Sequence, residues 1–336
     1  MIDTMTLGQA GAEVLDSSTL TVGNDVGIFT LSLDCEGLWG MADDRATMTS
    51  GRIGRRELED VYQFICGKLD QEGLFATAAF VSGFAAPQSV LQSCLHDFES
   101  LADRYPRWFE HILPRLRNGG DEALGGLEGH ACWKMLSERG HEMAWHGATH
   151  LPLDETLSDE AVQAELELGR KLWNELGQVP TSIVFPRNLV GHLDALYRAG
   201  FSAFRNSRRA DGFDRVLGMA REWDIFDDGD PCKASIRDGW CVVPAGHFLN
   251  WRSGPRKLVA PSVTLSRWRS MLGTAVQKGR HVHMWFHPHN LITAPTMREL
   301  FSSVMNEVGD LVRRGDLLNL TMSQIERRCR GFGRHG

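Results

Sequence analysis

Short apolar segments typical of strands alternate with amphipathic segments typical of helices along most of this 336-residue chain. The segment 27–34 reads GIFTLSLD and predicts a buried strand, and 54–71 repeats apolar side chains at helical spacing. The alternation continues to a last predicted helix at 323–330. Because parallel strands need crossover connections that are usually helical, this pattern predicts a mainly parallel α/β sheet, either open or closed into a barrel.

The remaining predicted strands are short and apolar, and they lie at 75–81, 142–145, 183–185, 202–204, 240–244, 281–286 and 317–320. The remaining predicted helices lie at 131–139, 158–176, 191–199, 265–277 and 297–313. Residues 84–130 are irregular to helical and too long for an ordinary crossover, so we predict an insertion there. We expect one catalytic domain over 27–330, preceded by an N-terminal extension at 1–26.

Charge and cysteine content narrow the class of protein. The chain has 36 basic and 43 acidic residues, a net charge of -7, which disfavours nucleic acid as a partner. Its seven cysteines form no CxxC pair, which favours a reducing compartment. The start of the chain has no basic segment followed by an apolar one, and no apolar run approaches the ~20 residues of a membrane span. We therefore expect a cytoplasmic protein without a membrane span.

Polar side chains directly follow four of the predicted strands. They are Asp34 and Glu36, His146 and His150, Arg187 and Asn188, and His287 and His289. In parallel α/β folds the functional site lies at the carboxyl ends of the strands, so we expect these side chains to converge.

Two histidines with a carboxylate are a recognised catalytic metal set, although the HxxxH spacing of His146 and His150 is weak evidence by itself. Asp34 and Glu36 should point to the same side of their strand, so one could bind a metal while the other takes a proton from water. The alternative is a solvated acidic loop. His287 has the chemistry of a general acid near neutral pH.

The segment GHEMAWHGATH at 140–150 resembles the GHEIGxHxxxH segment of the polysaccharide deacetylases, the NodB-homology group or carbohydrate esterase family 4. LSLDCE at 31–36 resembles the first motif of that family, in a variant with one residue between the acids, and WFH at 285–287 resembles its last motif. GQVP at 177–180, followed by a strand, a proline–arginine turn and a helix, resembles the next segment. The resemblance extends over roughly residues 28–325 in the order of the family.

This resemblance implies a deformed (β/α)7 barrel and a divalent metal, usually zinc, in a hydrolase that removes the N-acyl group of an amino sugar. His146, His150 and Glu36 would be the metal ligands. Asp34 would be the base, although the Asp-x-Glu spacing leaves open an exchange of roles between the two acids.

The same resemblance implies that Arg187 orients the base and that His287 is the acid. The arginine is shifted, because the usual Arg-x-Pro-Tyr is here Phe-Pro-Arg-Asn at 185–188. The Asp-Trp motif of the family has only a weak counterpart in Trp223-Asp224.

Further contacts to substrate are expected from Asn188, His289, Trp145 and His247, with a structural role as the alternative for His289. Aromatic residues of the insertion, such as Trp108, either stack on a sugar or belong to the core. A cytoplasmic location favours a small-molecule, nucleotide-linked or lipid-linked amino sugar from surface-glycan synthesis. The alternatives are an amide hydrolase of the same fold acting on a cyclic ureide or imide, and a non-catalytic carbohydrate-binding protein. No oligomeric state is predicted.

Overall fold

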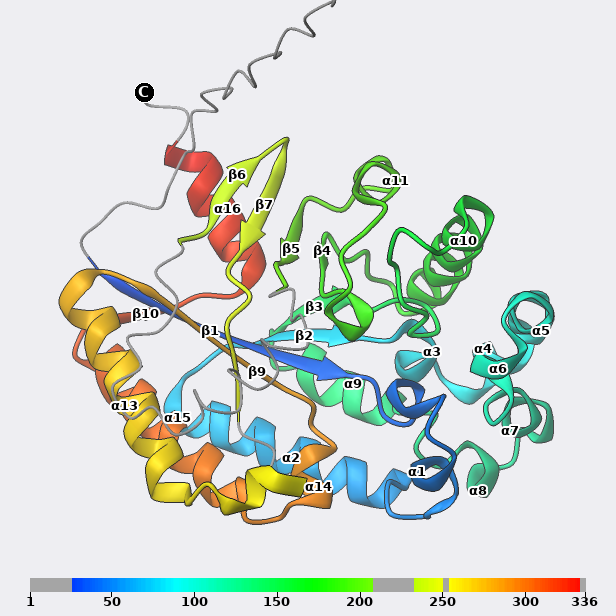
Figure 1. Ribbon diagram of the computed structural model, residues 1–336, viewed down its shortest axis with the longest axis horizontal. Helices are drawn as coiled ribbons and strands as arrows, with labels where there is room; N and C mark the ends of the chain where they lie inside the picture. Colours follow the sequence, from blue (N-terminus) through cyan, green and yellow to red (C-terminus); the bar gives the residue numbers. More distant parts are fainter. Residues whose placement is uncertain (1–25, 208–232, 250–253, 333–336) are drawn as a thin grey trace, which may run out of the picture.

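The computed structural model describes residues 26–207, 233–249 and 254–332, and Figure 1 shows one curled sheet with helices around it. The strands are β1 (Gly27–Cys35), β2 (Thr77–Phe80), β3 (Glu142–Trp145), β4 (Ser182–Ile183), β5 (Ala203–Arg205), β6 (Ser235–Arg237), β7 (Trp240–Val243), β8 (His247–Phe248), β9 (His281–Phe286) and β10 (Leu317–Asn319).

Neighbouring strands follow the order β6-β7-β5-β4-β3-β2-β1-β9-β8, and β10 pairs with β1 outside this path. All these pairs are parallel except β6 with β7, which is antiparallel. Because the path ends at β6 and at β8, the curled sheet is a half-barrel rather than a closed ring. The predicted deformed (β/α) barrel is confirmed in this form.

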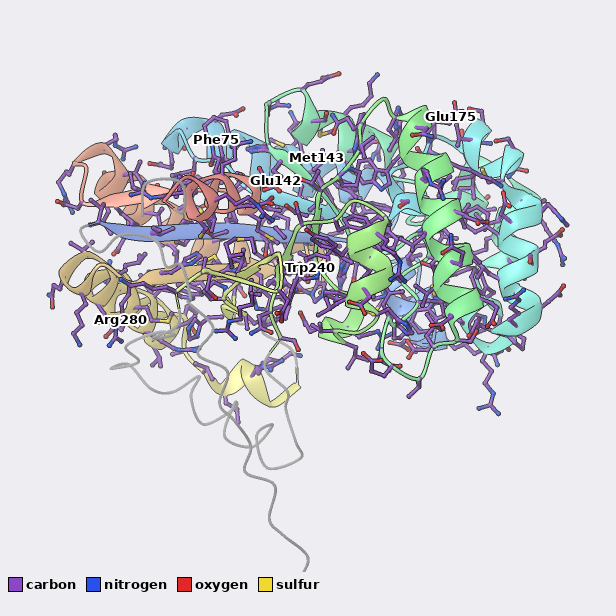
Figure 2. All side chains as sticks on the ribbon, turned by 90° about the horizontal axis from the view of Figure 1, so that it is seen from above. Phe75, Glu142, Met143, Glu175, Trp240 and Arg280 are labelled. Carbon is purple, nitrogen blue, oxygen red and sulfur yellow. The ribbon has the colours of Figure 1, made fainter. Side chains whose placement is uncertain are left out.

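The longer helices are α2 (Arg55–Glu72), α9 (His130–Ser137), α10 (Asp159–Glu175), α11 (Leu193–Arg198), α13 (Pro261–Lys278), α15 (Met297–Arg313) and α16 (Met322–Phe332). Local signals define their ends. The Ser158 hydroxyl caps α10 by accepting the amide of Ala161, and α2 stops at Gly73, whose φ of 68° suits glycine. In Figure 2, Arg280 before β9 and Glu175 at the end of α10 lie at opposite ends of the molecule.

The shorter helical segments are η1 (Trp39–Met41), α1 (Arg45–Thr49), α3 (Ser82–Ala85), η2 (Pro186–Asn188), η3 (Gly254–Leu258) and α14 (Asn290–Thr293). The segment predicted as an insertion forms α4 (Gln88–Ser93), α5 (Leu95–Arg104), α6 (Pro106–Phe109), α7 (Leu113–Asn118) and α8 (Asp121–Leu124). These five helices gather on one side of the molecule in Figure 1. Their buried side chains Phe98, Leu101 and Leu116 join the main hydrophobic core.

Strand β1 separates two environments, because alternate side chains of a strand point to opposite faces. Its apolar odd-numbered positions lie in the main core: Phe29, Leu31, Leu33 and Cys35. On the inner face of the half-barrel, Ile28 joins a smaller core with Met322, Ile325 and Cys329 of α16. Thr30, Ser32 and Asp34 follow Ile28 on this inner face, in order toward the carboxyl end of the strand.

The predicted N-terminal extension, except its last residue, and the Trp223-Asp224 candidate lie outside the described residues. The single-domain boundaries stay a prediction. Among the described segments, no helix combines the length and the hydropathy that crossing a bilayer requires.

Candidate functional site

Glu36, His146 and His150 meet at the carboxyl end of the sheet. One potential ligand atom from each buried side chain lies within 4.8 Å of the others. Oε2 of Glu36 lies 3.4 Å from Nε2 of His146 and 2.7 Å from Nε2 of His150. Burial alone would raise the pKa of Glu36, but the imidazoles of His287 and His150 outweigh it and hold that pKa well below its usual range. We call these three residues the Glu36 cluster.

A backbone carbonyl orients His146, and a glycine leaves room for the side chain of Glu36. Nδ1 of His146 lies 2.7 Å from the carbonyl oxygen of Val184. Because a carbonyl only accepts, this nitrogen carries the hydrogen, and Nε2 presents its lone pair to Glu36. On the other side, Gly40 leaves room for the carboxylate, since a β-carbon there would lie 2.0 Å from Oε1 of Glu36.

The loop that carries His150 is held by a buried carboxylate from α10. Glu165 accepts the backbone amides of Ala148 at 2.8 Å and Thr149 at 3.2 Å, and also the Thr149 hydroxyl. His150 adopts a left-handed backbone with φ 63°, which is costly for a residue with a β-carbon. The surrounding contacts therefore stabilise a strained conformation that turns this imidazole toward Glu36.

Asp34, two residues before Glu36, is paired with Arg205 at the end of β5. The two terminal nitrogens of Arg205 donate to the two carboxylate oxygens at 2.7 and 2.8 Å. Both side chains are at least 98% buried, with exposed fractions of 1% and 2%. Burial would raise the pKa of Asp34, but Arg205 and His146 outweigh it and lower that pKa below its ordinary value. Asp34 is therefore an ionised carboxylate fixed in a bidentate pair.

Arg187 does not contact Asp34, contrary to the prediction. Its Nη2 donates to the exposed Asp43 carboxylate at 2.5 Å and to the Gly40 carbonyl at 3.2 Å. Arg187 and Asn188 both have left-handed backbones, with φ values of 58° and 55°. In this turn it is Asn188 that reaches the buried pair, because its side-chain oxygen accepts Nη2 of Arg205 at 2.8 Å.

His287 faces both carboxylates from the end of β9. Its Nε2 lies 3.9 Å from Oδ2 of Asp34 and 3.6 Å from Oε1 of Glu36. Its Nδ1 lies 3.3 Å from the side-chain oxygen of Asn290, which can only accept, so Nδ1 carries the hydrogen. The side chain keeps 24% of its surface exposed, which gives Nε2 a position between the carboxylates and solvent.

The sequence interpretation missed a buried polar network behind Asp34. Nη1 of Arg205 also donates to the Ser32 hydroxyl at 2.9 Å, and this hydroxyl lies 2.9 Å from Nε2 of His283. Nδ1 of His283 lies 2.8 Å from the Pro244 carbonyl, so Ser32 donates to Nε2. Burial, followed by the positive charge of Arg205, holds the pKa of His283 well below its usual value. Arg205 could have been found from the sequence, because it directly follows the predicted strand at 202–204.

Trp145 and His247, which the sequence predicts to contact substrate, are packed inside the protein. The indole of Trp145 is 1% exposed, donates to the Ser82 hydroxyl at 3.0 Å and stacks on Phe201 with ring centroids 5.0 Å apart. Nδ1 of His247 lies 3.1 Å from Nη2 of Arg267, and its ring packs against Trp268. These contacts give both side chains a packing role, and their contact with substrate stays a prediction.

The insertion reaches the site through Trp108. Its indole nitrogen donates to the Thr149 carbonyl at 3.1 Å, and its ring lies parallel to that of His150 with centroids 6.1 Å apart. The Arg187 guanidinium lies 5.4 Å from the centre of the same indole. The insertion thus supports the loop that carries His150.

The Glu36 cluster fits a divalent cation. Nε2 of His146 is a buried atom without a hydrogen-bond partner among the described residues, and such nitrogens are rare unless a ligand engages them. Two imidazoles and one carboxylate are donors that zinc favours, and they leave coordination positions open for water and substrate. Glu36, His146 and His150 would hold the ion, and its identity stays a prediction.

No protein-family model matches the chain, and no curated protein matches it in sequence. Solved structures do resemble it. A candidate polysaccharide deacetylase from Mycobacterium smegmatis has a TM-score of 0.55 at 16% identity, covering 92% of this chain and 95% of its own. A second candidate polysaccharide deacetylase, from Pseudomonas aeruginosa PAO1, has a TM-score of 0.53 at 11% identity, covering 92% and 91%.

An allantoinase structure has a TM-score of 0.51 at 11% identity, covering 90% of this chain and 89% of its own. At these identities the likeness concerns the fold rather than the reaction. The curled parallel sheet and its surrounding helices extend over nearly the whole length of each pair. The chain therefore has the polysaccharide deacetylase fold.

Proposed function

We propose that this protein is a metal-dependent hydrolase that removes an N-acyl group, acetyl or formyl, from an amino sugar. One observation carries the proposal: the Glu36 cluster lies beside the Asp34–Arg205 pair, and His287 faces both carboxylates. A metal donor set, an ionised base and a titratable acid are the parts that amide hydrolysis needs. The resemblance of the sequence motifs to polysaccharide deacetylases supports the same reaction class.

A divalent cation held by Glu36, His146 and His150 would polarise the acyl carbonyl and make a nearby water molecule more acidic. Asp34 is suited to accept the proton of that water, because its carboxylate is kept ionised by Arg205. The bidentate contact also fixes the direction of the carboxylate, so no reorientation is needed when the proton arrives. Arg205 takes the positioning role that the sequence resemblance had given to Arg187.

His287 is suited to protonate the departing amine. Its Nδ1 hydrogen is engaged by Asn290, so the proton given to the amine would come from Nε2, the atom that faces Asp34 and Glu36. The partial exposure of His287 allows that proton to be replaced from solvent. Without such a donor the amine would have to leave as an anion, and amide cleavage would stop.

The proposed substrate is a small-molecule, nucleotide-linked or lipid-linked amino sugar used in surface-glycan synthesis. This choice depends on the cytoplasmic location that the sequence predicts. Asn188 and His289 remain candidates for substrate contact, because Asn188 touches the Arg205 pair and His289 stacks on His287.

A panel assay tests the reaction. The metal-loaded protein is incubated with N-acetyl and N-formyl hexosamines, free and nucleotide-linked, and release of acetate or formate is measured. We expect turnover with at least one of them and loss of turnover in Asp34→Asn with the metal content unchanged. Asp43→Asn is the matched control, because Asp43 lies at the surface and pairs with the exposed Arg187. Near-full turnover in Asp34→Asn would overturn the assignment of the base.

The alternatives are separated by the same panel. Turnover of a cyclic ureide or imide, with none of the amino sugars, would favour the reaction suggested by the likeness to the allantoinase fold. Absence of stoichiometric metal, together with no turnover of any acyl compound, would favour a non-catalytic carbohydrate-binding role. The complete set of a ligand cluster, a paired carboxylate and a facing imidazole argues for an enzyme.

A further inference from the structure

His289 lies beside the Glu36 cluster, and both of its ring nitrogens are buried without a hydrogen-bond partner in the described part of the chain. Only 2% of this residue is exposed. A neutral imidazole has one donor and one acceptor, and leaving both unsatisfied inside a protein is costly. The surroundings of His289 therefore indicate a ligand that the described side chains do not supply.

The neighbours of His289 have the chemistry of cation ligands. Its ring lies 5.2 Å from the ring of His287, at an angle of 22°. One potential ligand atom from each of Glu36, His287 and His289 lies within 4.8 Å of the others, as in the Glu36 cluster. Two imidazoles and a carboxylate again suit a transition-metal dication.

The two oxygens of Glu36 face different histidines. Oε2 lies near His146 and His150, whereas Oε1 lies 3.6 Å from Nε2 of His287. The hydrogen on Nδ1 of His287 leaves the Nε2 lone pair free to bind a cation when the ring is neutral. A carboxylate with one oxygen toward His146 and His150 and the other toward His287 has the arrangement of a bridging ligand.

We propose that Glu36, His287 and His289 form a second divalent-cation site, with Glu36 bridging it to the site of His146 and His150. The second site is the weaker one, because both ions share the Glu36 carboxylate and the charge of the other nearby carboxylate, Asp34, is already neutralised by Arg205. It is also the site nearer to solvent, since His287 is partly exposed and His146 is not.

Occupation of this second site would inhibit the enzyme. A cation bound to Nε2 of His287 excludes the proton that the departing amine needs. This consequence rests on the proposed function, whereas the site itself does not. Turnover should therefore rise with the first equivalent of zinc, fall with excess zinc, and recover when a chelator removes the excess.

Metal binding to the chelator-stripped full chain tests the site without any substrate. Titration with Zn²⁺ in a calorimeter should show two equivalents, one tight and one weaker, and His289→Gln should keep the first and lose the second. His287→Gln should do the same, and it tests the site from a more exposed position if the His289 variant does not fold. His141→Gln is the matched control, because His141 is also buried but lies before β3, and it should keep both equivalents.

Co²⁺ provides a second readout, because two ions that share a carboxylate couple magnetically and change the electron paramagnetic resonance signal between the first and second equivalents. Saturation of the wild type at one equivalent would overturn the site. So would a second equivalent that survives in both His289→Gln and His287→Gln, or one that is lost in His141→Gln. If two equivalents bind and no acyl compound is hydrolysed, the site stands and the proposed function fails.

Discussion

The two carboxylates at the end of β1 are two residues apart but have opposite kinds of surroundings. Both oxygens of Asp34 are paired with Arg205, which is held in turn by Ser32 and Asn188. Glu36 lies among imidazoles with several buried nitrogens that have no hydrogen-bond partner within 26–207, 233–249 and 254–332. The Asp34 side is therefore complete within the chain, whereas the Glu36 side needs a ligand to be satisfied.

This difference separates two ways of building a site. The ionised state and direction of Asp34 are paid for during folding, because its partner comes from the same chain. The Glu36 side keeps unsatisfied donors and acceptors that only a bound group engages, so part of its free energy appears on binding. Mutations on the two sides should therefore affect different quantities: stability at Asp34, and metal affinity at Glu36.

The largest expected effect is on the ligand-dependent side. His150→Gln should lower turnover by on the order of 10³-fold, because the loss of a metal ligand removes several kcal/mol of transition-state stabilisation. Its metal content, measured by mass spectrometry, should fall in parallel, while the unfolding midpoint of the metal-free protein stays near that of the wild type. Unchanged metal content in this variant would show that the Glu36 cluster is not the primary site.

On the complete side, Arg205→Gln should reduce the free energy of unfolding by about 3–5 kcal/mol, because it leaves the buried Asp34 charge without its partner. Arg187→Gln should change it by no more than about 1 kcal/mol, since the Arg187–Asp43 pair is exposed. Urea unfolding of the metal-free proteins measures both. Equal effects of the two substitutions would remove the distinction between a buried and an exposed arginine.

The pH dependence of the unfolding free energy tests whether burial of a histidine outside the site, His141, reduces stability in acid. Burial lowers the pKa of His141 from 6.5 to about 4, so the folded state binds fewer protons than the unfolded state. Stability from this group is fully present above the unfolded pKa of 6.5 and is lost as the pH falls toward 4. The loss amounts to at most about 3 kcal/mol. His141→Gln should make the unfolding free energy less dependent on pH across this window, and an unchanged slope would contradict the assignment.

The smallest expected effect concerns the network behind the base. Ser32→Ala removes one hydrogen bond to Arg205 and one to His283, and it should cost about 1–2 kcal/mol of stability. Because the bidentate contact with Asp34 remains, turnover should fall only a few-fold and metal content should not change. A loss of metal from this variant would mean that the surroundings of Asp34 and those of Glu36 are not independent.

Much of the site was predictable from the ends of strands. Asp34, His146 and His287 each lie at the end of a short predicted strand rich in apolar residues, so their place at the carboxyl edge could be read directly from the sequence. The alternation of strands and helices likewise predicted the architecture. The strands β6 and β8, of three and two residues, were missed.

What could not be predicted depends on backbone direction and on contacts between distant strands. Arg187 and Asn188 have positive φ values, which the sequence does not reveal because neither residue is a glycine. This backbone turns the Arg187 side chain to Asp43 rather than to Asp34. Arg205 reaches Asp34 across 171 positions of sequence, and only the curl of the sheet brings the two together. Trp145 precedes His146 in the sequence, yet its side chain is buried in the core, so a position next to a proposed metal ligand does not by itself predict a substrate contact.

Gly40 links the identity of one residue to that of another. A methyl group at position 40 would lie 2.0 Å from Oε1 of Glu36, so the two positions cannot vary independently while the carboxylate stays in place. Among relatives of this chain, a glycine at the equivalent of position 40 should accompany a glutamate two residues after the aspartate. Sequences with a larger residue at position 40 should carry their ligand carboxylate elsewhere, which makes this glycine a marker for the Asp-x-Glu form of the site.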